Sequence, residues 1–195
     1  MLLQLIANGI SSGSLYALIA LGFYLIYRTT GIFHFAHGVI FTIAAYLTYF
    51  FYETLRLPFG LSLLIVIFSA ALIGVVIEVF IYSPLRKQNA SPLVLLIGSL
   101  GVFIFLQNLI LLLGGTDTRI VSSEIKSGYS LLGVTFTTIQ YITLLTAIIA
   151  YIFIFFYMRN TKNGKAIRAV ASDPSMAEIV GVDVPKIYLL VFAFG

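Results

Sequence analysis

Residues 88–116 read QNASPLVLLIGSLGVFIFLQNLILLLGGT and contain no charged side chain over 29 residues. A helix needs about 20 consecutive apolar residues to cross the hydrocarbon core of a bilayer. Four further charge-free runs are at least this long, at residues 1–27, 29–52, 57–77 and 127–158. Runs of this length predict membrane-spanning helices rather than the shorter, alternating strands of a membrane barrel.

The overall composition excludes a water-soluble globular protein. Of the 195 residues, 61% are hydrophobic and only 9% are charged, whereas soluble domains are near 45–50% apolar and about 25% charged. The sequence contains no cysteine, which excludes disulfides and thiolate metal ligands. The net charge of +4 does not indicate a nucleic-acid partner, because the basic residues lie between the apolar runs, where they set membrane orientation.

The apolar runs predict an all-α, polytopic transmembrane helical bundle that forms a single transmembrane domain over residues 1–195. A sixth run begins at Ile187 and stops at Gly195 after nine residues. We therefore expect only the start of a sixth span, and a domain that is incomplete at its C-terminus. The five full spans are expected at residues 4–27, 33–54, 61–83, 93–113 and 139–158.

The distribution of Lys and Arg residues predicts the orientation of the chain. The loops after the first, third and fifth predicted helices hold eight basic residues, and the loops after the second and fourth hold three. Cytoplasmic loops carry the excess of basic residues, so we expect the N-terminus outside the cell (inner) membrane and the loop 159–186 in the cytoplasm. The polar segment 114–138 is then an external loop, with room for a short strand or hairpin.

Polar side chains in the first predicted helix recur every four residues, an advance of only about 40° around an α-helix. They are Gln4, Asn8, Ser12 and Tyr16, with Ser11 among them. The face that they form serves either helix–helix hydrogen bonding or a solute pathway, and both interpretations remain open. In the fourth predicted helix, the adjacent amides Gln107 and Asn108 are candidates for a cavity wall or an interhelical clamp.

Three titratable residues in the predicted spans need an explanation. Glu78 lies late in the third helix, eight residues before Arg86, where a carboxylate can reach water or a basic partner, and this structural role is favoured over a proton relay. His34 and His37 would lie on one helical face near the cytoplasmic interface. Two of the four ligands that zinc usually takes are missing there, so no metal site is expected.

The loop RNTKNGKAIRAVASDPSMAEIVGVDVPK (159–186) has the pattern of a helical hairpin, because apolar residues recur with helical spacing on both sides of Asp173. Asp173 can cap a second short helix, in which Pro174 suits the first position and Gly181 the end. One alternative is an interfacial helix attracted to anionic lipid. The acidic second half of the loop instead favours docking into a groove of another protein.

Several motifs, taken in order, resemble one family of membrane proteins. The segment GKAIRAVASDPSMAEIVGV (164–182) resembles the cytoplasmic coupling loop of bacterial ABC-importer permeases. Ala177 and Gly181 match the Ala-x-x-x-Gly of the motif known as EAA, while Ser175 and Met176 replace its Glu and Ala. The other motifs are similar to those of the high-affinity branched-chain amino-acid permease family, where His34 replaces an Asn. They are GSLYALIALG (13–22), FAHG (35–38), Glu78 with YSPLR (82–86), and FLQN (105–108).

The resemblance implies a permease subunit of an ATP-binding-cassette importer for branched-chain or other small amino acids, with contact to membrane lipid, no cofactor and no enzymatic activity. The implied partners are two ABC ATPase subunits, a second permease subunit and an external solute-binding protein. The residues expected to couple to the ATPases are Gly164, Arg168, Ala169, Asp173, Ala177 and Gly181. The residues expected along the substrate pathway are Asn8, Ser11, Ser12, Tyr16, Gln107 and Asn108.

The sequence leaves three alternatives to this function. The first is a permease for urea or short amides of the same superfamily, and the second is an ATP-independent transporter. The third is an intramembrane enzyme that uses His34 or His37 as a general base, which would need an acid or nucleophile at the same depth. The chain has no Gly-x-x-x-x-Gly-Lys-Ser/Thr phosphate loop, so ATP hydrolysis by that route is expected in a partner.

Overall fold

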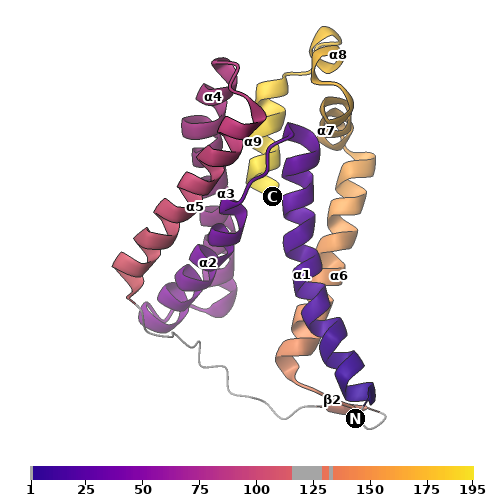
Figure 1. Ribbon diagram of the computed structural model, residues 1–195. Coiled ribbons are helices and arrows are strands. Elements are labelled where there is room, and N and C mark those ends of the chain that lie inside the picture. Colours follow the sequence, from indigo (N-terminus) through magenta and orange to yellow (C-terminus); the bar gives the residue numbers. More distant parts are fainter. Residues whose placement is uncertain (1, 116–128, 132–133) are drawn as a thin grey trace. The chain divides into compact units, whose positions relative to one another are not determined.

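The structure is a computed structural model that describes residues 2–115, 129–131 and 134–195, and nearly all of these residues are helical (Figure 1). Helices labelled η are π-helices. The elements in chain order are α1 (Leu2–Thr30), α2 (Ala36–Tyr49), η1 (Phe50–Thr54), α3 (Phe59–Ile77), η2 (Glu78–Tyr82), α4 (Ser83–Lys87), α5 (Pro92–Gly114), β1 (Tyr129–Leu131), β2 (Val134–Phe136), α6 (Thr138–Asn160), α7 (Lys162–Ser172), α8 (Pro174–Ile179) and α9 (Val184–Phe194).

The chain divides into two compact units. The first contains residues 1–22 and 122–165, and the second contains residues 23–121 and 166–195. The boundaries fall inside α1, after Gly22, and inside α7, after Lys165.

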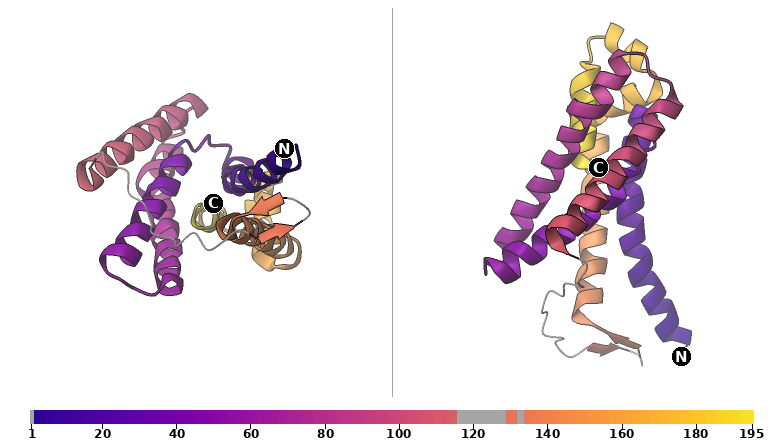
Figure 2. Two further views of the ribbon diagram at one scale, coloured as in Figure 1. Left: turned by 90° about the horizontal axis from the view of Figure 1, so that it is seen from below. Right: turned by 60° about the vertical axis from the view of Figure 1, so that its left-hand side comes forward.

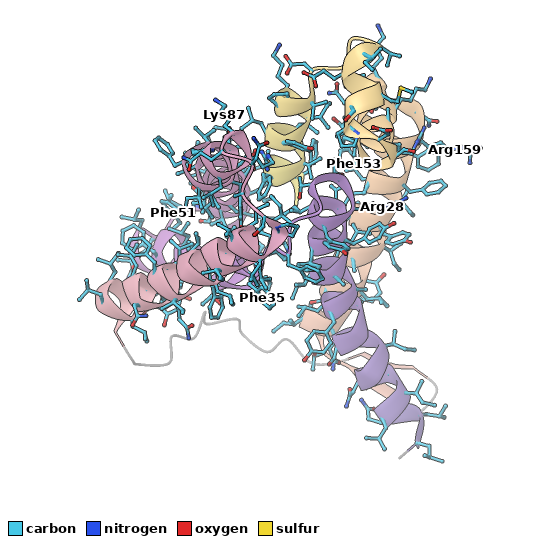
Figure 3. All side chains as sticks on the ribbon, turned by 45° about the horizontal axis from the view of Figure 1, so that its top comes forward. Arg28, Phe35, Phe51, Lys87, Phe153 and Arg159 are labelled. Atoms are coloured by element: carbon cyan, nitrogen blue, oxygen red, sulfur yellow. The ribbon has the colours of Figure 1, made fainter. Side chains whose placement is uncertain are left out.

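In the first unit, α6 runs alongside the first part of α1 (Figures 1 and 2). Thr137 and Gln140 form a capping box at the start of α6, in which the Gln140 N–H donates to Thr137 Oγ1 at 3.3 Å and the Thr137 N–H donates to Gln140 Oε1 at 3.0 Å. Apolar side chains such as Phe153, which is exposed, project outward from α6 (Figure 3). Such a surface suits contact with lipid rather than water.

The two strands of the first unit pair antiparallel, with Tyr129 opposite Phe136. This hairpin confirms the expectation of short strands within the segment 114–138. The rest of that predicted loop, residues 116–128 and 132–133, lies outside the described residues.

In the second unit, α3 packs against both α2 and α9, and α2 also packs against α5 (Figure 2). Helix α9 approaches α3 closely at Gly74, where the backbone carbonyl of Phe192 occupies the space that a Cβ atom would need. A glycine at this position therefore allows α9 to lie directly on α3. The aliphatic core of this unit includes Val39, Val66, Ile77, Val102 and Val191.

The five predicted spans are all present as helices. In the described residues, four helices are long and apolar enough to cross a membrane, namely α1, the continuous helix 59–87, α5 and α6. The fifth consists of α2 and η1, which together run without interruption from Ala36 to Thr54. The predicted polytopic helical fold is confirmed, with α9 as a shorter apolar helix and one two-stranded hairpin beside the helices.

One predicted boundary is wrong. The second helix was expected to begin at residue 33, but residues 31–35 are not helical. The Phe35 N–H donates to Ser99 Oγ on α5 at 2.7 Å, and this bond replaces a bond within a helix. His34 therefore precedes α2, and the expectation that His34 and His37 share one helical face is also wrong.

Candidate coupling and solute sites

The hairpin formed by residues 166–181 is shaped by local hydrogen bonds. Asp173 Oδ1 accepts from the N–H groups of Ser175 at 2.9 Å and Met176 at 3.0 Å, which caps α8. Pro174 occupies the first helical position, where its missing N–H costs nothing. These contacts confirm the predicted cap and the predicted second helix.

Gly181 ends α8 in the left-handed backbone conformation, with φ of +88°. Its N–H donates to the Glu178 carbonyl, and the Val182 N–H donates to the Ala177 carbonyl, both at 2.9 Å. This pair of bonds is a Schellman motif, which glycine adopts without steric cost. In the Ala-x-x-x-Gly spacing that resembles the coupling motif, Gly181 thus supplies the positive φ of the turn, while the backbone carbonyl of residue 177 accepts the closing bond and the Ala177 side chain is buried.

The hairpin has a buried and an exposed side. Ile167, Val170 and Ala177 are buried. On the other side, the apolar side chains of Met176, Ile179 and Val180 are 61%, 77% and 75% exposed. Large apolar groups exposed on a loop, rather than on a membrane span, indicate a surface for contact with another molecule.

The six residues predicted to couple to the ATPases fall into two groups. Arg168 and Ala169 are exposed on α7, whereas the remaining four maintain the geometry of the loop. Gly164 belongs to the first unit, where it is buried and its N–H donates to Thr161 Oγ1 at 2.9 Å. The exposed residues Met176, Ile179 and Val180 were not among the predicted coupling residues. Their apolar character was visible in the sequence, but their exposure was not.

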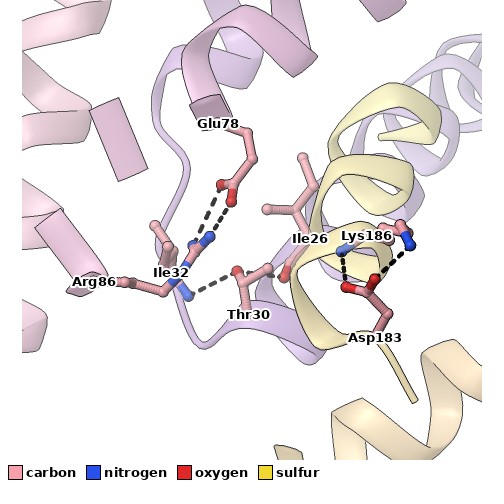
Figure 4. Close-up of polar contacts among 7 residues, drawn as sticks. All are labelled: Ile26, Thr30, Ile32, Glu78, Arg86, Asp183 and Lys186. Atoms are coloured by element: carbon pink, nitrogen blue, oxygen red, sulfur yellow. Dashed lines mark hydrogen bonds and ion pairs between the residues drawn. The ribbon is translucent and has the colours of Figure 1, made fainter. Parts of the chain in front are cut away.

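Asp183 links the hairpin to α9. Its Oδ1 accepts from the Lys186 N–H at 3.2 Å, which caps α9, and its Oδ2 pairs with Lys186 Nζ at 2.6 Å (Figure 4). The side-chain hydrogen bond from Lys186 holds the pKa of the Asp183 carboxyl below its ordinary value. The cap therefore keeps its negative charge next to the positive end of the helix dipole.

In the first unit, a polar cluster joins α1 to α6. Asn8 Oδ1 accepts from Gln4 Nε2 at 3.3 Å and from Gln140 Nε2 at 3.1 Å. The sequence interpretation placed Gln4 and Asn8 on one face but missed Gln140. The only available signal was the capping-box spacing from Thr137 to Gln140.

The other predicted pathway residues of α1 do not form an enclosed site. Ser11 is buried, while Asn8, Ser12 and Tyr16 are exposed, Tyr16 by 69%. A Cβ atom added at Gly9 or Gly13 would meet nothing within 4 Å. This polar face is thus open along the described part of the chain, so its role in a solute pathway stays a prediction.

The predicted pathway residues on α5 belong to the second unit and are also exposed. Asn108 Nδ2 donates to the Ile104 carbonyl of its own helix at 2.8 Å. Gln107 beside it is exposed as well. The interpretation of these two amides as a cavity wall or an interhelical clamp stays open.

Polar and aromatic side chains meet in the centre of the second unit. His34 Nδ1 lies 2.8 Å from Tyr82 Oη, and the ring centroid of Phe192 lies 5.1 Å from that of His34 and 5.2 Å from that of Tyr82. His34 and His37 line a cavity of about 200 Å³ whose other walls are aliphatic and aromatic. In the described part of the chain, no group of three or more His, Asp or Glu residues could hold a metal ion.

Glu78 has the basic partner that the sequence suggested. Arg86 donates to both oxygens of its carboxylate, from Nη1 to Oε2 at 3.3 Å and from Nη2 to Oε1 (Figure 4). The Glu78 side chain is 2% exposed and that of Arg86 is 22% exposed. This pairing supports the structural role over a proton relay, because the charge of Glu78 is already compensated.

Long apolar helices, sparse charges and a separately capped loop hairpin define a polytopic helical membrane protein. The sequence profile of the family described as "Branched-chain amino acid transport system / permease component" matches residues 5–195. The chain therefore belongs to this family of transport permeases.

Individual relatives agree with the family profile. The chain is 30% identical over 208 residues to the high-affinity branched-chain amino acid transport system permease protein LivH of Salmonella typhimurium, and 29% identical to LivH of Escherichia coli. It is 31% identical over 210 residues to the corresponding permease protein BraD of Pseudomonas aeruginosa. Each comparison covers 99% of this chain and 66% of the relative, so the chain spans about two thirds of the length of these relatives. These relatives are transport permeases and not enzymes, which agrees with the expectation for this chain. No solved structure matches the chain significantly.

Proposed function

We propose that this chain is the permease subunit of an ATP-binding-cassette importer in the cell (inner) membrane, and that it translocates branched-chain or other small amino acids. Two ATPase subunits, a second permease subunit and an external solute-binding protein complete the importer. The observation that carries the proposal is the family match over residues 5–195 together with the capped hairpin at 166–181. The permease names of the relatives support the same solute class.

The hairpin suits an ATPase-docking role for physical reasons. Its apolar side chains Met176, Ile179 and Val180 are exposed, while Asp173 and Gly181 fix the backbone that presents them. A short helix that is held rigid loses little conformational entropy when it enters a groove, so more of its contact energy remains for binding. ATP-driven movement of the partner would act on the permease through this contact.

The solute pathway in this proposal runs along the polar residues of α1 and α5. The proposed pathway residues are Asn8, Ser11, Ser12 and Tyr16 on α1, in the first unit, and Gln107 and Asn108 on α5, in the second unit. These side chains offer hydrogen bonds without a net charge, which suits the passage of a zwitterion. Most of them are exposed in the isolated chain, so a pathway would form only when other helices enclose them.

Uptake of labelled leucine into proteoliposomes tests the proposed function. The full-length permease is assembled with two ABC ATPase subunits, a second permease subunit and a solute-binding protein. We expect uptake that requires ATP and is inhibited by unlabelled valine or isoleucine. Uptake without ATPase subunits would contradict the ATP-driven mechanism. Inhibition by urea or acetamide, but not by valine, would contradict the solute class.

A further inference from the structure

Side chains of α9 contact side chains of the segment formed by η2 and α4. Tyr188 and Phe192 lie four residues apart on one side of α9. The guanidinium carbon of Arg86 lies 4.3 Å from the ring centroid of Tyr188. One helical turn further along, the ring of Phe192 packs against those of Tyr82 and His34, with centroid separations of 5.2 and 5.1 Å, and the rings of Tyr82 and His34 are themselves 5.5 Å apart.

The π-helix η2 keeps Glu78, Tyr82 and Arg86 in line. In an α-helix, each four-residue step overshoots a full turn by about 40°, so three such residues would drift around the axis. Within η2 the Ser83 N–H donates to the carbonyl of Glu78, five residues earlier. This wider turn makes four residues fall short of a full rotation. The two deviations oppose each other, so Tyr82 and Arg86 both reach α9, at Phe192 and Tyr188, while Glu78 stays within reach of Arg86.

This contact lies on a continuous path from the hairpin to the break between α1 and α2. The hairpin helix α8 contacts α9, and α9 begins at the Asp183 cap. Phe192 of α9 contacts His34, which belongs to the non-helical segment 31–35. Every contact on the path lies within the second unit.

We propose that Arg86, held by Glu78, is the positioning residue that fastens α9 to the bundle through Tyr188. Displacement of the hairpin then moves the segment 31–35 together with α9. The inference rests on the proposed function, because it gives that displacement a source in the ATPases. Arg suits this role because a delocalised guanidinium can pair with a carboxylate along its edge and lie on an aromatic ring with its face.

The variant Tyr188→Leu tests the proposal, with Tyr188→Phe as the matched control. Both are made in the assembled importer described above, and the solute imported per ATP hydrolysed is measured. We expect Tyr188→Leu to lower this ratio several-fold while the ATPase subunits still co-purify. Tyr188→Phe should keep the wild-type ratio, because its ring presents the same face to Arg86. An unchanged ratio in Tyr188→Leu would overturn the positioning role.

A double variant covers the case in which Tyr188→Leu does not fold. Glu78→Gln combined with Arg86→Met removes the guanidinium without leaving a buried charge unpaired, and it should reproduce the lower ratio. A wild-type ratio in this variant would overturn the proposal. If the wild-type importer itself shows no ATP-driven uptake, the proposed function fails and the positioning role falls with it. Wild-type uptake together with wild-type coupling in the variants contradicts the positioning role alone.

A distance measurement tests whether Tyr188 transmits movement from the hairpin to the segment 31–35 or only stabilises the fold. The chain has no cysteine, so cysteines introduced at the exposed positions Val180 and Phe33 can carry spin labels without background. We expect the separation of the two labels to stay the same when ATP is added to the wild-type importer, because both ends move together. In Tyr188→Leu, the separation should change or broaden on addition of ATP. Identical behaviour of the two proteins would contradict the inference.

Discussion

The guanidinium group of Arg86 lies over the ring of Tyr188 while both of its terminal nitrogens bond the carboxylate of Glu78. One arginine therefore compensates a buried charge and contacts the helix that follows the hairpin. The pair joins residues eight positions apart in one continuous helix, and the aromatic contact joins residues about one hundred positions apart. In this account, the Arg86 side chain contributes both to the stability of the fold and to the coupling between the hairpin and the bundle. Suitable variants separate the two effects.

Removal of Arg86 alone should cost more stability than removal of the whole ion pair. Arg86→Gln leaves the Glu78 carboxylate buried and unpaired, and breaking a buried pair costs about 3–5 kcal/mol. Because the Arg86 side chain is 22% exposed, we expect the lower end of this range. Thermal unfolding in detergent should give a lower apparent Tm for Arg86→Gln than for Glu78→Gln/Arg86→Gln. A Tm for Arg86→Gln equal to that of wild type would show that the pair is not important for stability.

Replacement of Gly74 by alanine should disturb the packing of α3 on α9. The added methyl group would meet the backbone carbonyl of Phe192, and overpacking of this kind costs about 1–3 kcal/mol. Gly101→Ala in α5 is the matched control, because its methyl group would meet nothing within 4 Å. Alanine is also the better helix former by about 1 kcal/mol. In detergent, only the Gly74 variant should unfold at a lower temperature, and equal effects of the two substitutions would refute the close contact.

The length of the apolar runs was sufficient to predict the membrane helices. The helix expected at residues 93–113, for example, runs from Pro92 to Gly114. Long apolar runs predict a helix because lipid offers no hydrogen-bond partners to the backbone, which must then satisfy its N–H and C=O groups within the helix. The caps of the hairpin were equally predictable, since Asp173 and Gly181 act on their immediate neighbours.

Features that depend on distant residues could not be predicted from the sequence. The helix break at 31–35 is stabilised by Ser99 and Tyr82, which lie 64 and 48 positions away from their partners Phe35 and His34. Local spacing around His34 and His37 is compatible with a helix, so the predicted helix began too early. The exposure of Met176 and Ile179 likewise depends on which distant residues pack against α8, and the local sequence does not show this. Whether the polar face around Asn8 lines a solute pathway depends on which other helices enclose it, and the local sequence does not specify those helices.

Gly181 should tolerate asparagine better than valine. Its φ of +88° lies in the region that costs other residues about 1–2 kcal/mol, although asparagine adopts such conformations more readily than β-branched residues do. We expect Gly181→Val to reduce co-purification of the ATPase subunits strongly, and Gly181→Asn to retain most of it. Membrane levels of both variants should match wild type. Equal co-purification with Gly181→Val would argue against the hairpin as the docking element.

Removal of the α8 cap should loosen the hairpin without changing its exposed side chains. Asp173→Ala removes the acceptor for the N–H groups of Ser175 and Met176, and loss of an N-cap costs about 1 kcal/mol. Hydrogen–deuterium exchange of the peptide covering α8 should become faster by about fivefold, since 1.4 kcal/mol corresponds to tenfold. Asp173→Asn keeps a side-chain acceptor and should exchange at nearly the wild-type rate. Unchanged exchange in the alanine variant would mean that other contacts hold α8.

The location of the hairpin is the central claim, and cysteine labelling tests it most directly. Because the chain contains no cysteine, single cysteines can be introduced at Val180 in the hairpin and at Phe59, the exposed first residue of α3 at the end expected outside. Each cysteine then shows on which side of the membrane its position lies. In intact cells, a membrane-impermeant maleimide should label the cysteine at position 59 and leave that at position 180 unlabelled until the membrane is inverted. Labelling of position 180 from outside would contradict the account.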